Sequence, residues 1–111
     1  MNRRAAEQQI YRTTTVGQLV AALLECRDQT DICYVFENHQ GGTFGFGIAC
    51  QRLGISKADW DYANEVAGFH ALVGIVGEKL GLPRYDPAAD KARRKQISES
   101  TKSIEATNQR K

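Results

Sequence analysis

Residues 32–48, with the sequence ICYVFENHQGGTFGFGI, decide the predicted fold class. Residues 32–36 are rich in β-branched and aromatic side chains and are bounded by polar residues, which is typical of a strand. Residues 38–42 have the composition of a turn. Residues 43–48 then alternate large apolar residues with glycine, as expected for a second strand. The sequence therefore predicts a β-hairpin over residues 32–48.

The second strand of this hairpin would have one bare face. Phe44, Phe46 and Ile48 would share one side, with Gly45 and Gly47 on the other. Glycine weakens a strand, so the bare face indicates that another group approaches it closely. We therefore treat one set of residues as a candidate ligand face: Gly45, Gly47, Phe44 and Phe46. The segment lacks the lysine of a phosphate-binding loop and the full dinucleotide-binding fingerprint, so a structural hairpin is the simpler interpretation.

Helices are predicted on both sides of the hairpin. Thr15 and Gln18 match a capping box, and apolar residues at helical spacing follow, which predicts a helix over 16–27. Ser56 is a suitable N-cap for a long helix over 57–80, which Gly81 and Pro83 would end.

The long helix carries an apolar stripe whose members are spaced alternately by four and three residues. These residues are Tyr62, Val66, Phe69, Val73, Val76 and Leu80. A second stripe of alanine and glycine leaves the helix apolar around much of its circumference. One hairpin and one short helix would hardly cover that surface, so the stripe predicts a homo-oligomer interface.

These elements together predict an α+β fold within a single domain over residues 14–83. Residues 1–13 are expected to be flexible or partly helical. Residues 84–111 are poor in large apolar side chains, which predicts a short exposed helix near 87–97 that fades into a disordered basic tail.

The formal net charge of +2 conceals an uneven distribution along the 111 residues. Residues 13–82 carry four basic and eight acidic side chains, whereas residues 83–111 carry eight basic and four acidic ones. The basic cluster of Lys91, Arg93, Arg94 and Lys95 is a candidate contact for nucleic acid or for an acidic protein surface.

Residues 49–63 resemble the core of a bacterial helix-turn-helix. The resemblance adds Arg52 and Lys57 as candidate nucleic-acid contacts. Two features count against it: Gly45 and Gly47 disfavour the preceding helix, and the second helix would present carboxylates to the DNA phosphates.

No catalytic, cofactor-binding or metal-binding residues are predicted. The three cysteines include no Cys-x-x-Cys pair and are expected to be small buried residues in a reducing compartment. His39 is expected to be solvated in a turn, and His70 to be a core or interface residue. With no signal peptide and no stretch long enough to span a bilayer, we expect a cytoplasmic protein without membrane contact.

The opening helix that starts Thr-Val-Gly-Gln-Leu, followed by a strand and a glycine-rich hairpin, resembles small uncharacterised proteins of phages and mobile elements. The resemblance covers residues 14–48. It implies an α-β-β opening and a phage or mobile-element origin, and it carries no function.

Three functional hypotheses follow. The first is a non-enzymatic accessory protein that acts by oligomerisation and by binding another protein. The second is a small helix-turn-helix-like DNA-binding regulator. The third is a binder of a small ligand or nucleotide that uses the glycine-rich segment.

Overall fold

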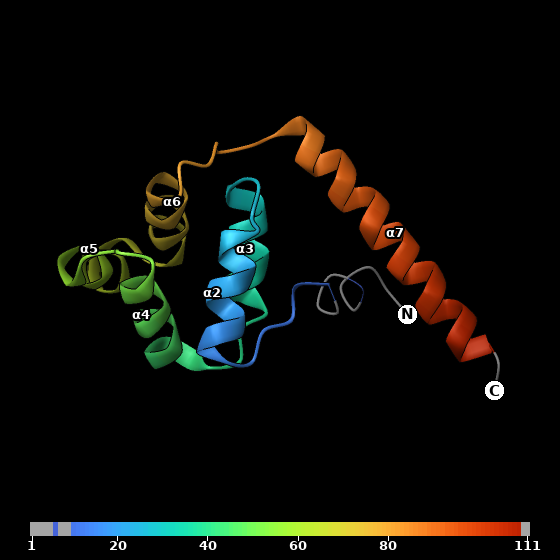
Figure 1. The fold of residues 1–111 in the computed structure, drawn as a ribbon, viewed down its shortest axis with the longest axis horizontal. Coiled ribbons are helices and arrows are strands. Elements are labelled where there is room, and N and C mark those ends of the chain that lie inside the picture. The colour runs from blue at the N-terminus through green and yellow to red at the C-terminus, as the bar shows by residue number, and fades with distance from the viewer. Residues whose placement is uncertain (1–5, 7–9, 110–111) are drawn as a thin grey trace.

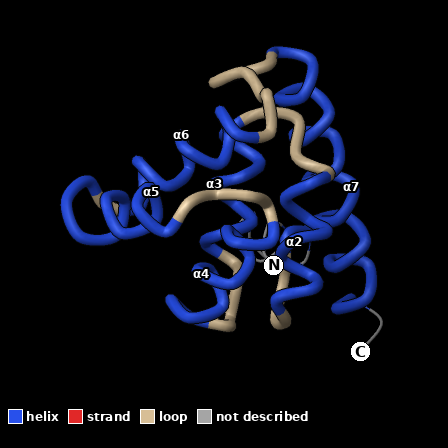
Figure 2. Tube along the Cα trace, turned by 60° about the vertical axis from the view of Figure 1, so that its left-hand side comes forward, coloured by secondary structure: helices blue, strands red, loops and turns tan. Residues whose placement is uncertain are grey.

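The computed structural model describes Ala6 and residues 10–109, with side chains described as far as Ser100. In this part of the chain, six α-helices and one π-helical turn form the regular structure, and no strand occurs (Figure 1 and Figure 2). The predicted α+β class is therefore wrong, and so is the α-β-β opening that the resemblance implied. Backbone pairing of the β type is limited here to one isolated parallel bridge between Thr13 and His39.

Helix α2 (Val16–Leu24) begins where the sequence predicts, although it ends three residues earlier. The capping box is formed: the Thr15 hydroxyl accepts from the Gln18 N–H, and the Gln18 side-chain oxygen accepts from the Thr15 N–H, each at 3.1 Å. This reciprocal pair satisfies two of the amides that a helix start leaves open.

Helix α3 (Gln29–Glu37) replaces the first predicted strand. Asp28 is its N-cap, and its carboxylate accepts from the Asp31 N–H at 3.1 Å. Ile32, Val35 and Phe36 are all buried, which is the i, i+3, i+4 spacing of a helical face. Burial of this face overrides the strand preference of β-branched and aromatic residues, because that preference depends on context.

Helix α4 (Gly42–Arg52) replaces the second predicted strand despite its glycines. Phe46, Ala49, Cys50 and Leu53 pack on the core at spacing i, i+3, i+4, i+7. The alternation of phenylalanine and glycine concealed this pattern. The objection that glycine would prevent a helix before residue 54 is also wrong.

The long helix predicted over 57–80 is interrupted. Helix α5 (Lys57–Tyr62) runs into a π-helical turn, η1 (Ala63–Ala67), and Gly68 with φ 79° separates this turn from helix α6 (Phe69–Lys79). The Gly68 N–H donates to the Ala63 carbonyl, five residues earlier. A positive φ is accessible to glycine and costly for other residues, so the chain changes direction here.

The core forms where α3 packs against α2 and α6 while α4 packs against α2. Its most deeply buried large apolar residues are Leu19, Leu23, Ile32, Val35, Phe36 and Val76. Helix α7 (Pro87–Gln109) follows a loop after α6 and diverges from α2 and α3 toward the C-terminus (Figure 1).

Helix α7 corrects the expectation of a short exposed helix or disordered tail. It starts at Pro87 as predicted, but the helix continues to Gln109. Ala89, Arg93 and Ile97 form a buried stripe along its first turns. The predicted flexible or partly helical segment 1–13 lies largely outside the described residues, although Ala6 is helical and buried and Ile10 and Tyr11 are helical.

Candidate functional site

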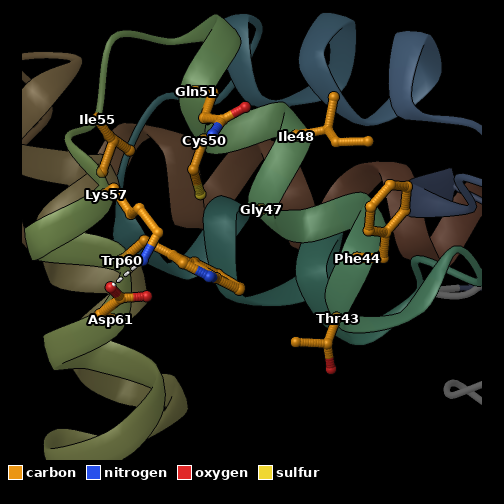
Figure 3. Close-up of a pocket in the computed structure, with 10 residues that line it drawn as sticks. All are labelled: Thr43, Phe44, Gly47, Ile48, Cys50, Gln51, Ile55, Lys57, Trp60 and Asp61. Carbon is orange, nitrogen blue, oxygen red and sulfur yellow. Dashed lines mark hydrogen bonds and ion pairs between the residues drawn. The ribbon is translucent and has the colours of Figure 1, made fainter.

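A pocket of about 300 Å³ lies between α4 and α5 (Figure 3). Helix α4 supplies one wall, and α5 with the preceding loop supplies the other. The lining residues are Thr43, Phe44, Gly47, Ile48, Cys50, Gln51, Ile55, Lys57, Trp60 and Asp61.

The walls of this α4–α5 pocket are largely apolar. Trp60 lies beside Gly47, where a Cβ atom would sit 3.6 Å from the indole ring. Ile55 and Cys50 are buried, whereas Phe44, on the opposite side of the pocket from Trp60, is 80% exposed. A concave apolar surface with few polar groups is the usual form of a small-molecule site.

Local sequence places α5 against α4. Gly54 adopts φ 86° after α4, and Ser56 then caps α5 by accepting from the Asp59 N–H at 3.2 Å. The cap starts the helix three residues before Trp60, which brings the indole ring over Gly47. The turn and the cap thus form the pocket from neighbouring segments of the chain.

An ion pair borders the pocket. Lys57 Nζ and Asp61 Oδ2 are 2.7 Å apart, one helical turn from each other on α5 (Figure 3). The hydrogen bond to Asp61 raises the pKa of Lys57. Burial raises the pKa of the Cys50 thiol to about 11, so this cysteine stays protonated near neutral pH and is a poor nucleophile.

A smaller pocket of about 140 Å³ lies on another side of Trp60. It is bordered by Phe46, Gly68, Phe69 and Leu72, among others. Trp60 and Thr43 line both pockets, so the indole ring is shared between them.

A third pocket of about 360 Å³ lies among the segment around Tyr11, helices α2 and α3, and Gln96 of α7. Its charged groups include Arg27 and Asp31, whose Nε and Oδ2 atoms are 2.8 Å apart. Tyr11 donates to Asp31 at 3.0 Å. Burial, followed by the charge and hydrogen bond of Asp31, raises the pKa of Tyr11. These groups already bond to one another, so they are less available to a ligand. The third pocket is also more polar than the α4–α5 pocket.

Arg93 lies in a buried carboxylate cluster rather than at the surface. Its side chain is 2% exposed, and Nη1 donates to Asp28 at 2.8 Å and to Asp31 at 3.0 Å. Burial disfavours the charged form of Asp31, but hydrogen bonds from Arg27 and Arg93 outweigh it and lower its pKa to about 2. Arg93 therefore joins α7 to the start of α3 and is not free to contact nucleic acid.

The other predicted nucleic-acid contacts do not form one surface. Arg52 is exposed on α4 and Lys57 is paired with Asp61, whereas Lys91, Arg94 and Lys95 are exposed on α7, across the molecule in Figure 1. Arg94 is paired with Asp90 at 3.0 Å. Helices α4 and α5 follow one another across a short turn, but α5 has only six residues and includes Asp59 and Asp61. This arrangement repels a phosphate backbone.

The predicted oligomer stripe is divided by the break at Gly68. Val73 and Val76 are buried in the protein's own core, while Phe69 and Leu80 pack against that core in part. Tyr62 and Val66 remain 56% and 73% exposed.

The predicted ligand face is also divided. Gly47 and Phe44 line the α4–α5 pocket. Phe46 instead stacks edge-on against Phe36 with ring centroids 5.1 Å apart. Gly45 is buried against His39: a Cβ atom there would lie 2.7 Å from Nε2.

Sequence reasoning missed Trp60 and Ile55 as pocket residues and His39 as a buried one. The signal for Trp60 was its place just after a helix start at Ser56, opposite a glycine-rich segment. The signal for His39 was the pair Gly41 and Gly45, which lie one helical turn apart beside its ring. His70, expected in the core or an interface, is exposed on α6.

Two further features bear on the chemistry of the described residues. None of their histidine, cysteine, aspartate and glutamate side chains form a group of three or more suited to a metal ion. No helix among them combines the length and apolar character needed to cross a membrane.

In the comparisons with known proteins, no family model, no curated protein and no solved structure matches this chain.

Proposed function

We propose that this protein is a non-enzymatic binding protein that holds a small apolar ligand in the α4–α5 pocket. The observation that carries the proposal is the open space of about 300 Å³ between Trp60 and Phe44, with Gly47 between them. Binding would stabilise the folded protein by removing apolar surface from water. The three free thiols of Cys26, Cys33 and Cys50 favour a reducing compartment such as the cytoplasm.

A thermal-shift screen with uncharged apolar compounds tests this function. Trp60 is the only tryptophan of the chain, so its fluorescence reports on the pocket directly. Gly47→Leu places a side chain in the pocket and keeps the aromatic walls of Trp60 and Phe44, so it should abolish both the thermal shift and the fluorescence change. Gly74→Leu is the matched control on another helix, because a Cβ atom at Gly74 meets nothing within 4 Å. If no compound of the panel raises the melting temperature, the proposal fails.

The second candidate is protein binding, including self-association, through exposed apolar side chains of α5 and η1. Tyr62 and Val66 are the residues that favour it, because both are large apolar side chains that stay more than half exposed on one short segment. Light scattering of the wild type and of Val66→Asp tests this candidate. An oligomer that Val66→Asp converts to a folded monomer supports it, whereas a monomeric wild type excludes self-association.

A further inference from the structure

The charges at the border of the α4–α5 pocket determine which chemical class of ligand it accepts, an inference that rests on the proposed function. Of the described residues that line the α4–α5 pocket, only Lys57 and Asp61 are charged. Their side chains pair at 2.7 Å, so the border of the pocket has no net charge. The remaining polar side chains, Thr43 and Gln51, are neutral and exposed.

A charged ligand would lose its hydration in this pocket without gaining a free counter-charge. The wall that it would meet consists of Trp60, Phe44, Ile48 and the buried Ile55. Moving an ion from water to apolar surroundings is costly unless an opposite charge or several hydrogen bonds replace the water. Lys57 is a cation, but it is already engaged by Asp61.

We infer that the α4–α5 pocket selects uncharged, ring-containing apolar molecules, and that Asp61 excludes anions by neutralising Lys57. Asp61 is a specificity-determining residue in this view. Its carboxylate offsets the positive charge of Lys57 at the border of the pocket, while the apolar wall provides the affinity. Removing the carboxylate leaves an unpaired ammonium group beside the same wall, which should admit an anionic ligand.

Two probes with the same ring system separate these effects. N-phenyl-1-naphthylamine is uncharged, and 8-anilinonaphthalene-1-sulfonate adds one sulfonate to the same rings. Binding of each to the full-length protein is followed by energy transfer from Trp60. The wild type should bind the uncharged probe at least tenfold more tightly than the sulfonate.

Asp61→Asn should tighten binding of the sulfonate about fivefold, the size expected of an exposed ion pair, and leave the uncharged probe within about twofold. Added salt should weaken the gain, because salt screens the charge of the exposed Lys57. Asp59→Asn is the matched control: it removes the same charge from the same helix at a residue that does not line the pocket. Circular dichroism confirms that both variants fold, and Gly47→Leu shows that the probes occupy this pocket.

The outcomes distinguish the two proposals. If neither probe binds the wild type, the proposed function is overturned. If both bind equally, or if Asp61→Asn does not favour the sulfonate, the pocket binds ligands but the charge selection is overturned. The selection is also overturned if Asp59→Asn produces the same gain, because the effect then reflects net charge alone.

Discussion

At the residue scale, His39 explains the glycines that flank it. Its ring lies so close to α4 that a Cβ atom at Gly41 would be 2.4 Å from Nε2. Nδ1 lies 3.2 Å from the Thr13 hydroxyl, whereas buried Nε2 has no hydrogen-bond partner among the described residues. The glycines of this segment, which suggested a bare strand face, make room for a buried imidazole.

This burial predicts that stability depends on pH near neutrality. Burial lowers the pKa of His39 below its ordinary value of 6.5, so the unfolded chain binds the proton more readily. The free energy of unfolding should therefore reach its highest value above about pH 6.5 and should decrease as the pH falls below 6.5. Chemical denaturation between pH 5 and 7.5 measures the slope.

The two histidines of the chain provide the control for this measurement. His39→Gln should remove the slope, and His70→Gln should retain it, because His70 is exposed. An unchanged slope in His39→Gln would show that another group is responsible.

The same substitution at two helical glycines should have opposite effects. Gly74→Ala meets nothing within 4 Å and should raise the free energy of unfolding by up to about 1 kcal/mol, since alanine favours a helix. Gly45→Ala would place its Cβ 2.7 Å from the His39 ring. Overpacking costs about 1–3 kcal/mol, so this variant should be less stable than the wild type. Urea denaturation of both proteins compares them, and equal effects would contradict the packing of His39.

At the element scale, Gly68 decides that residues 57–80 form two helices. Its φ of 79° and ψ of −169° belong to a region that only glycine occupies readily. The apolar spacing continues across this residue, so periodicity alone predicts one helix. The break leaves Val66 exposed and directs Val73 and Val76 into the core.

Gly68→Ala tests this backbone requirement. A Cβ atom at this position meets nothing within 4 Å, so the cost comes from the backbone conformation and not from a clash. We expect the free energy of unfolding to fall by about 1–3 kcal/mol. Thermal or urea unfolding measures it, with Gly74→Ala as the control in a regular helix. A variant that gains both helical signal and stability would indicate that the break is not intrinsic to the fold.

At the scale of the whole molecule, one guanidinium group ties the C-terminal helix to the core. Arg93 contacts Asp28 and Asp31, which lie 65 and 62 residues away in sequence. Asp28 also accepts from the Asp86 N–H at 2.9 Å, so the loop before α7 is held at the same point. The cluster joins the start of α3 to the start of α7.

Removal of this guanidinium should destabilise the protein strongly. Arg93→Met leaves two buried carboxylates without their shared cation, and breaking a buried pair in this way costs about 3–5 kcal/mol. The control is Arg94→Met, because Arg94 is exposed and its surface pair with Asp90 contributes at most about 1 kcal/mol. Urea denaturation distinguishes the two variants, and equal stabilities would show that the cluster does not hold the molecule together.

The sequence by itself determined several helix starts and stops. The capping box at Thr15, the cap at Ser56, the end near Gly81 and the start at Pro87 each depend on residues within about one helical turn. Short-range hydrogen bonds and backbone preferences fix such features, so they can be predicted from the sequence without knowledge of the fold.

Tertiary structure alone decided the fold class and the site. Residues 32–36 became helical because Ile32, Val35 and Phe36 pack in the core with α2 and α6. Helix α4 formed because Phe46, Ala49 and Cys50 pack on the same core, and its glycines leave room for the imidazole of His39. Arg93, predicted to be a surface contact, is buried because carboxylates more than 60 residues away surround it. The α4–α5 pocket likewise exists only where Trp60 meets Gly47. These outcomes depend on burial against distant segments, and burial energy outweighs the small local preferences from which the strands were predicted.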